Sequence, residues 1–223
     1  AARRRVLAWA VAANLALLVV FKYTHFLAAN LAPLLAPLGI TVGTPPPIPL
    51  PIGISFYTFH AISYLIDVHR RNAQPNPSLV QYSLYIMLFP QLVAGPIIRY
   101  KDIHRQLGER RVGLADVEAG VVRFTQGLAK KVLIANPLAL IADAGFHDAG
   151  TGLATADAWL ALTCYTLQIY FDFSGYSDMA IGLGKMFGFT FLENFDFPYI
   201  ARSITEFWRR WHLSLSTWFR DYL

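Results

Sequence analysis

His212 is the side chain in this sequence best suited to proton transfer, because a histidine titrates near neutral pH. It follows Trp208 and Trp211 in the aromatic-rich run FWRRWHLSLSTWFRDYL. A histidine on such an aromatic face is more often a structural hydrogen-bond donor than a catalytic group. Both interpretations stay open on these residues alone, and His212 is a candidate site residue with Trp208 and Trp211 as supporting neighbours.

Asp172, Ser174 and Asp178 form a second candidate group, in the run YFDFSGYSDMAIGLGKMFGF. A carboxylate at membrane depth is costly, so such a residue is usually functional or held by a partner. The sequence leaves both roles open, because Gly175 also permits an unusual backbone at which amides would hold an aspartate. We therefore expect a helix break between Asp172 and Gly175.

The spacing of the other reactive side chains predicts neither a metal site nor a nucleotide site. The five other histidines show no HExxH spacing and no pairing with the single cysteine, Cys164. The run GLGK at 182–185 is followed by Met186, where a phosphate-binding loop needs Ser or Thr. A nucleophilic serine elbow is absent as well.

The elements that must position the candidate residues are membrane helices. The 223 residues are 55% hydrophobic and 15% charged, with a mean hydropathy of +0.40, whereas soluble domains carry about 25% charged residues. The net charge of +5 comes from short basic runs, which in a membrane protein indicate topology rather than nucleic-acid binding. The expected fold class is all-α, a polytopic membrane protein with transmembrane, re-entrant and interfacial helices and no nucleic-acid partner.

The apolar stretches set the expected positions of the crossing helices, since a helix needs about 20 residues to span a bilayer. Seven prolines within residues 28–51 predict an extended or short-helix connector. Residues 116–145 are expected to form an amphipathic, partly interfacial helix. The expected membrane helices are residues 6–27, 52–68, 155–170 and 176–191.

Residues 79–99 are also long enough to cross, but Pro90, Gly95 and Pro96 interrupt their second half. A full crossing would put the basic segment 99–111 on the outer side, against the positive-inside rule. A re-entrant hairpin removes that conflict. Broken backbone at membrane depth is tolerated only where protein or a water-filled cavity covers it, so Pro90, Gly95 and Pro96 are predicted to line a cavity.

The stretch that begins at Ser203 predicts one helix to the end of the sequence. Ser203 and Glu206 have the spacing of a capping box, in which Ser203 accepts from the Glu206 amide and Glu206 reaches back. An aromatic stripe backed by basic residues suits the edge of a bilayer. The residues expected to share that face are Trp208, Trp211, His212, Leu215, Phe219 and Tyr222.

Five runs of the sequence together resemble the membrane-bound O-acyltransferase family. They follow one another over nearly the whole chain: PIGISFYTFHAISYLIDVHR, LFPQLVAGPIIRY, FTQGLAKKVLIAN, YFDFSGYSDMAIGLGKMFGF and FWRRWHLSLSTWFRDYL. The resemblance implies a ring of membrane helices around a thin centre that a tunnel pierces. It also implies that residues 1–223 are an internal portion of a single membrane domain, with no separate soluble domain.

The resemblance implies an O-acyltransferase of the bacterial inner membrane that crosses it several times. The expected donor is a cytoplasmic thioester, either acetyl-CoA or an acyl carrier, with no bound cofactor and no metal. The expected acceptor is an exported polysaccharide such as alginate, and the expected partners are membrane lipid and a periplasmic acetyl-acceptor protein or polysaccharide machinery. The alternatives are D-alanyl transfer to a cell-envelope polymer and a non-catalytic transporter or flippase.

The family has two characteristic histidines, and its first motif is matched here by residues 208–212. The resemblance therefore implies that His212 lines the site. The second histidine, generally held to be the catalytic base, is expected downstream of Leu223, so this portion is expected to be inactive by itself. The segments 90–96 and 172–178 are expected to line or support the tunnel.

Overall fold

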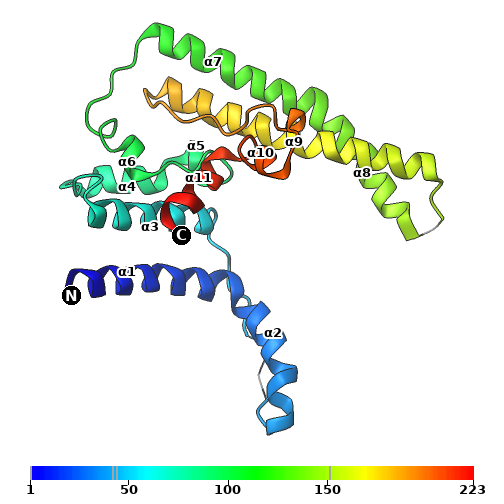
Figure 1. Ribbon diagram of the computed structural model, residues 1–223, viewed down its shortest axis with the longest axis horizontal. Coiled ribbons are helices and arrows are strands. Elements are labelled where there is room, and N and C mark those ends of the chain that lie inside the picture. The colour runs from blue at the N-terminus through cyan, green and yellow to red at the C-terminus, as the bar shows by residue number, and fades with distance from the viewer. Residues whose placement is uncertain (1, 42, 44, 151) are drawn as a thin grey trace. The chain divides into compact units, whose positions relative to one another are not determined.

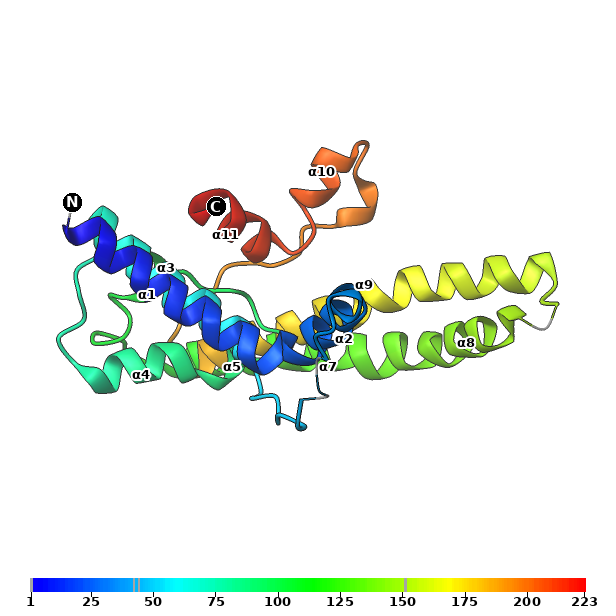
Figure 2. The same cartoon turned by 90° about the horizontal axis from the view of Figure 1, so that it is seen from below.

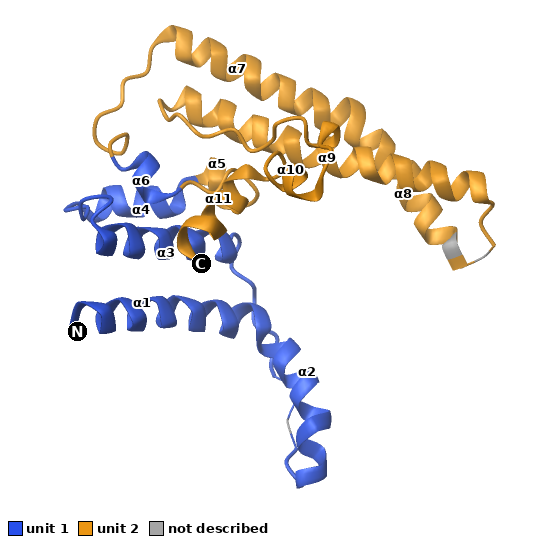
Figure 3. Ribbon diagram, viewed as in Figure 1, with its two compact units in different colours: residues 1–88, 99–104 blue, residues 89–98, 105–223 orange. Residues whose placement is uncertain are grey.

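The computed structural model describes residues 2–41, 43, 45–150 and 152–223, and over these residues the chain is helical without β-strands (Figure 1). The all-α class predicted from the sequence is confirmed. The chain divides into two compact units (Figure 3). Unit 1 comprises residues 1–88 and 99–104, and unit 2 comprises residues 89–98 and 105–223.

Unit 1 begins with a long apolar helical run. Its parts are α1 (Ala2–Leu18), the π-helical turn η1 (Val19–Tyr23), α2 (Thr24–Leu35) and the 3-10 turn η2 (Ala36–Leu38). Within the part of the chain that the structure describes, this run alone is long and apolar enough to cross a membrane. The helix expected at residues 6–27 therefore exists and extends further at both ends.

Beyond η2, the described residues of the proline-rich connector run without helix until α3 (Ile54–Arg70). The connector predicted at residues 28–51 is therefore confirmed only beyond Leu38, because α2 continues through Pro33 and η2 follows it directly. α3 lies along α1, as Figure 2 shows, and it also contacts α4 (Leu79–Met87) and α6 (Tyr100–Ile103). The helix expected at residues 52–68 is thus present, whereas its crossing of a membrane stays a prediction.

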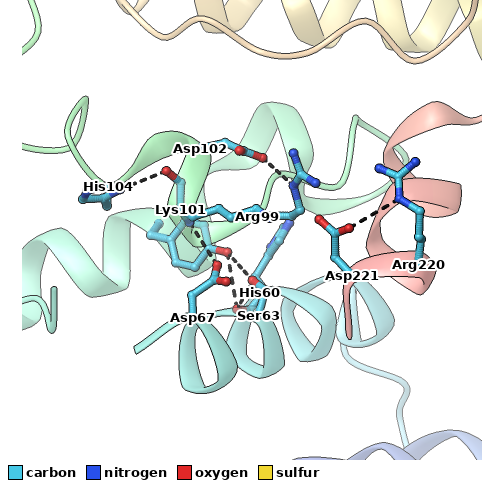
Figure 4. A network of polar contacts seen from close by, with 10 residues as sticks. His60, Ser63, Asp67, Arg99, Lys101, Asp102, His104, Arg220 and Asp221 are labelled. Carbon is cyan, nitrogen blue, oxygen red and sulfur yellow. Dashed lines mark hydrogen bonds and ion pairs between the residues drawn. The ribbon is translucent and has the colours of Figure 1, made fainter. Parts of the chain in front are cut away.

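Buried polar groups on α3 are held by nearby backbone and side chains (Figure 4). The Ser63 hydroxyl lies 2.8 Å from the His60 carbonyl oxygen and 2.8 Å from the Tyr85 hydroxyl. The Asp67 carboxylate accepts a hydrogen bond of 3.1 Å from the backbone N–H of Lys101, at the start of α6. Asp67 therefore ties α6 to α3.

Unit 2 is built on two long helical runs that lie side by side (Figures 1 and 2). The first run is α7 (Leu114–Ala129), the π-helical turn η3 (Lys130–Ala135) and α8 (Asn136–His147). The second is α9 (Thr155–Met186). The helix expected over residues 116–145 is confirmed, and its interfacial position stays a prediction.

Two pairs of glycines allow α7 and α9 to approach closely. A Cβ atom placed on Gly182 would lie 2.6 Å from the carbonyl oxygen of Gly120. One placed on Gly175 would lie 2.7 Å from the carbonyl oxygen of Gly127. Side chains at these positions would force the helices apart, so backbone lies directly against backbone at both crossings.

The continuity of α9 corrects one expectation. The sequence predicted a break between Asp172 and Gly175, with separate helices at 155–170 and 176–191, but α9 runs unbroken from Thr155 to Met186. Gly175 serves the close packing against α7 instead of a turn. The aspartates on either side obtain cationic side-chain partners, so they need no free backbone amides.

The interruption expected within residues 79–99 is present. α4 ends at Met87, α5 (Phe89–Leu92) is a single turn, and residues 93–99 are not helical. Pro90, Gly95 and Pro96 are buried there, and a Cβ on Gly95 would lie 2.7 Å from the Cα of Gln91. The broken backbone is therefore tightly packed, while its re-entrant path through a membrane stays a prediction.

The end of unit 2 corrects a second expectation. The single helix predicted from Ser203 onward is divided into α10 (Ile204–Trp208) and α11 (Leu213–Tyr222), which follow the short turn η5 (Pro198–Ile200). The aromatic residues consequently do not form one stripe: Trp208 is 52% exposed, whereas Tyr222 is 8% exposed.

The cap at Ser203 is confirmed, since its hydroxyl accepts the Glu206 N–H at 3.1 Å. Glu206 reaches back one residue further than predicted, to the N–H of Arg202 at 2.9 Å.

A candidate site around His212

His212 is the last residue of the link between α10 and α11. At this link, backbone hydrogen bonds join the chain to the segment 192–197. The backbone carbonyl of Asn194 accepts the N–H of Leu213 at 2.9 Å, and the N–H of Asp196 donates to the carbonyl of Arg210 at 2.9 Å. These long-range bonds replace helical ones. His212 itself has a φ of 46°, a left-handed conformation that costs a non-glycine residue of order 1–3 kcal/mol and is found preferentially at functional sites.

The imidazole of His212 is buried and held by one side chain. Its Nδ1 lies 3.0 Å from the Oδ1 atom of Asn194, which also accepts the N–H of Ser214 at 3.2 Å and the Ser214 hydroxyl at 2.8 Å. His212 is 9% exposed and Asn194 is fully buried. The ring is therefore fixed in one orientation at the break between two helices.

Aromatic rings surround this histidine. The ring of Phe173, on α9, meets the imidazole edge to face with a centroid distance of 4.8 Å. Trp211 stacks on Phe207 at 5.5 Å and meets Phe195 edge to face at 5.1 Å. Trp211 thus packs among aromatic rings next to His212, and its supporting role in the site stays a prediction.

Burial in these surroundings lowers the pKa of His212 from 6.5 to about 4. The residue lies outside the helices that the sequence predicts to cross the membrane. At neutral pH the imidazole is therefore uncharged, with one nitrogen able to accept a proton.

A polar cavity of about 420 Å³ adjoins this arrangement through Asn194, which belongs to its lining. Ser174 and Ser177 line the same cavity from α9. Within the described part of the chain, the hydroxyls of these serines and the Nδ2 atom of Asn194 are buried without hydrogen-bond partners. The cavity therefore presents hydrogen-bonding groups close to the imidazole.

Asp178 contributes charge to the cavity as part of an ion-pair network. Its carboxylate lies 2.7 Å from the guanidinium of Arg123 and 2.6 Å from the Nζ atom of Lys130. Arg123 also pairs with Glu193 at 2.5 Å. Asp178 is thus a carboxylate held by partners on α7 and η3, and its role in a site stays a prediction.

Asp172 likewise pairs with Lys131, on η3, and is not part of the cavity lining that the structure describes. Trp208 lines a different pocket together with Arg209 and Arg220.

Pro90, Gly95 and Pro96 are not among the described residues that line the cavity beside His212. The structure therefore brings Ser174, Asp178, Trp211 and His212 into one neighbourhood and leaves the other predicted site residues outside it.

Asn194, Arg123 and Lys130 are the site residues that the sequence did not assign. Asn194 lies 18 residues before His212, and Arg123 lies 55 residues before Asp178. No spacing rule connects residues so far apart. The signal available in the sequence was the placement of both cations on the predicted helix of residues 116–145.

Comparison with known proteins adds a family-level result. Residues 8–223 match the membrane-bound O-acyltransferase family. The sequence is 50% identical over 220 residues to a protein of Pseudomonas putida named probable alginate O-acetylase AlgI, covering 99% of this chain and 45% of that protein.

More distant relatives have other named acceptors. The peptidoglycan O-acetyltransferase of Helicobacter pylori is 36% identical over 238 residues, covering 95% of this chain and 44% of the relative. The teichoic acid D-alanyltransferase of Bacillus subtilis is 30% identical over 179 residues, covering 77% of this chain and 44% of the relative. The chain thus spans less than half the length of these curated relatives.

Proposed function

The chain belongs to the membrane-bound O-acyltransferase family, and we propose that the complete protein transfers an acetyl group to an exported polysaccharide such as alginate. The identity of 50% to a protein named probable alginate O-acetylase supports this acceptor over the others. We propose that the reaction passes the acyl group across the bacterial inner membrane, in which the protein is multi-pass. The one long apolar run of unit 1 is compatible with that location.

The observation that carries the proposal is the buried imidazole of His212, oriented by Asn194 beside a cavity with polar lining residues. A neutral imidazole accepts a proton from a hydroxyl or holds one near an acyl group, and the exclusion of water strengthens such interactions. Ser174 and Asp178 both line the cavity. We propose that Ser174 offers a hydroxyl there and that Asp178 supplies a negative charge. We propose His212 as a proton-transferring residue that lines the site. The resemblance implies that the main catalytic base is a second histidine, to which we assign no residue of this chain.

The proposed donor is a cytoplasmic thioester, acetyl-CoA or an acyl carrier. The proposed partners are membrane lipid and a periplasmic acetyl-acceptor protein or polysaccharide machinery. D-alanyl transfer to a cell-envelope polymer is the second candidate, supported by the 30% identity to a teichoic acid D-alanyltransferase.

The test is acetyl transfer in membranes that contain the full-length protein, with labelled acetyl donor and polysaccharide acceptor. We expect His212→Ala to reduce transfer by about 100-fold or more, the usual contribution of a proton-transferring side chain. His147→Ala is the matched control, because His147 is an exposed histidine of the same unit.

Full transfer by a well-folded His212→Ala protein would remove His212 from the site. Transfer of D-alanine instead of acetyl by the unaltered protein would favour the second candidate.

A further inference from the structure

We propose that Asn194 is a positioning residue: it holds neutral His212 with the proton on Nδ1 and leaves Nε2 as the nitrogen that faces the reacting group. The participation of His212 in a reaction rests on the proposed function, whereas its tautomer and orientation follow from hydrogen bonding alone. Asn194 lies outside the motif around His212, 18 residues before that histidine.

The first step is the orientation of the Asn194 amide. Oxygen and nitrogen of an asparagine side chain are distinguished by their partners. The backbone N–H of Ser214 lies 3.2 Å from the atom placed as Oδ1, and a backbone N–H only donates. That atom must therefore be the oxygen, which also explains why the Ser214 hydroxyl donates to it at 2.8 Å.

The second step is the tautomer of His212. An amide oxygen carries no hydrogen, so the 3.0 Å contact is a hydrogen bond only if Nδ1 of His212 donates. The neutral ring then has its lone pair on Nε2. Nε2 makes no hydrogen bond to any residue within the described part of the chain, since the contacts of this ring are made through Nδ1.

The third step is rigidity. Asn194 bonds the start of α11 through both its backbone and its side chain. Its backbone carbonyl accepts the Leu213 N–H at 2.9 Å, and its side chain bonds His212 and Ser214. Asn194 is fully buried. The left-handed backbone of His212 is thus fixed from the segment 192–197 and cannot relax without breaking several bonds.

The fourth step concerns charge. A neutral asparagine, unlike an aspartate, does not favour the imidazolium form. Six carboxylates on the elements around His212 are each paired with a cation: Asp172, Asp178, Glu193, Asp196, Glu206 and Asp221. The titratable and charged residues of these elements are the following. On α9 they are Asp157, Cys164, Tyr165, Tyr170, Asp172, Tyr176, Asp178 and Lys185; in the segment 192–197 they are Glu193 and Asp196; around α10 they are Tyr199, Arg202, Glu206, Arg209 and Arg210; and on α11 they are Arg220, Asp221 and Tyr222.

The test uses the full-length protein in proteoliposomes and the reagent diethyl pyrocarbonate, which modifies unprotonated imidazole. Modification of His212 is followed against pH by peptide mass spectrometry, for the unaltered protein and for Asn194→Asp and Asn194→Ala. Asn76→Asp is the matched control, because Asn76 also accepts a backbone N–H, at 2.9 Å from Ser78, but belongs to unit 1.

We expect Asn194→Asp to raise the midpoint pH of His212 modification by about one to three pH units, since a carboxylate beside the ring favours its charged form. Asn76→Asp is expected to leave that midpoint unchanged. An unchanged midpoint in a folded Asn194→Asp protein would overturn the proposal. We expect Asn194→Ala to lower acetyl transfer at saturating substrate more than it raises KM, because the ring loses its orientation.

A second measurement needs no substitution at Asn194 and therefore does not depend on the variants folding. Solid-state NMR of protein labelled with ¹⁵N-histidine gives the tautomer of His212, assigned by the signal that His212→Gln removes. The Nδ1–H form supports the proposal, and the Nε2–H form refutes it. The midpoint pH of His212 modification and the NMR tautomer are both measured without acetyl transfer. Failure of the proposed function would therefore be seen separately, as an unaltered protein that transfers no acetyl group.

Discussion

Each unit of the molecule contains a buried histidine, and the two are held in different ways. His60, on α3 of unit 1, is fully buried, with its ring 5.4 Å from that of Tyr85. Neither of its ring nitrogens has a hydrogen-bond partner within the described part of the chain. His212, in unit 2, is held by Asn194 through Nδ1. His60 is therefore positioned by packing alone, whereas His212 is oriented by a hydrogen bond.

The backbone around the two histidines also differs. His60 lies within the continuous helix α3, so its position follows from helical geometry. His212 lies at a break with a φ of 46°, and bonds from a distant segment maintain it. Burial is common to both histidines, so it does not distinguish them. The hydrogen bond to Asn194 and the unusual backbone are found at His212 and underlie the role that we propose for it.

The largest expected effect separates the two histidines by activity. We expect His212→Leu to lower acetyl transfer by about 100-fold or more. We expect His60→Leu to leave transfer within about twofold of the unaltered protein, because exchanging an unpartnered buried polar group for an apolar one costs little. Transfer in membranes of the full-length protein is the measurement. Loss of transfer in a folded His60→Leu protein would show that the contrast between the histidines is wrong.

A smaller effect is expected in the pH dependence of stability. Burial lowers the pKa of His212 to about 4, whereas an unfolded histidine titrates near its ordinary value of about 6.5. As the pH falls from 6.5 to 4, the unfolded chain binds a proton that folded His212 does not, so the free energy of unfolding decreases. The slope from one such group is at most about 1.4 kcal/mol per pH unit.

The check is the urea midpoint of the full-length protein in detergent between pH 7 and pH 4.5. Replacing His212 by Gln should make this acid loss shallower, and the exposed His147→Gln control should not. Equal slopes for the His212→Gln and unaltered proteins would argue that the imidazole titrates normally in the folded state.

The smallest expected effect concerns the cap that starts the helix before His212. Ser203→Ala removes the hydroxyl that accepts the Glu206 N–H, at an expected cost of about 1 kcal/mol in the free energy of unfolding. Thr205→Ala, at an exposed position in the same turn, is the control. A cost well above about 1 kcal/mol, together with lost transfer, would mean that the break at His212 depends on the local cap more than on Asn194.

The parts of the fold that local patterns control were predictable. The helices over 54–70 and 114–147, the interruption near Pro90 and the cap at Ser203 all follow from hydrophobic runs, proline and capping residues. The errors at 172–175 and 209–212 share one physical cause. Contacts with residues distant in the sequence override local preference, through helix packing at Gly175 and through hydrogen bonds from Asn194.

The candidate site was likewise predictable only where local sequence motifs indicate its residues. The motif at 208–212, which resembles that of the family, indicated His212 as a site residue. The apolar residues around Asp178 indicated that this carboxylate needs a partner or a function. Their partners Asn194 and Arg123 were not predicted, because the contacts join segments that only the folded chain brings together. For Asp178, the structure was needed to identify its cationic partners.

The paired glycines of α7 and α9 limit where residues can be inserted or deleted in these two helices. Gly120 and Gly127 are separated by seven positions, as are Gly175 and Gly182, and each pair meets the other with backbone against backbone. One inserted or deleted residue between the members of a pair would turn one glycine away by about 100° and bring a side chain into the crossing. We therefore expect natural insertions and deletions to fall in the connecting loops of this region and to spare both intervals between the glycines.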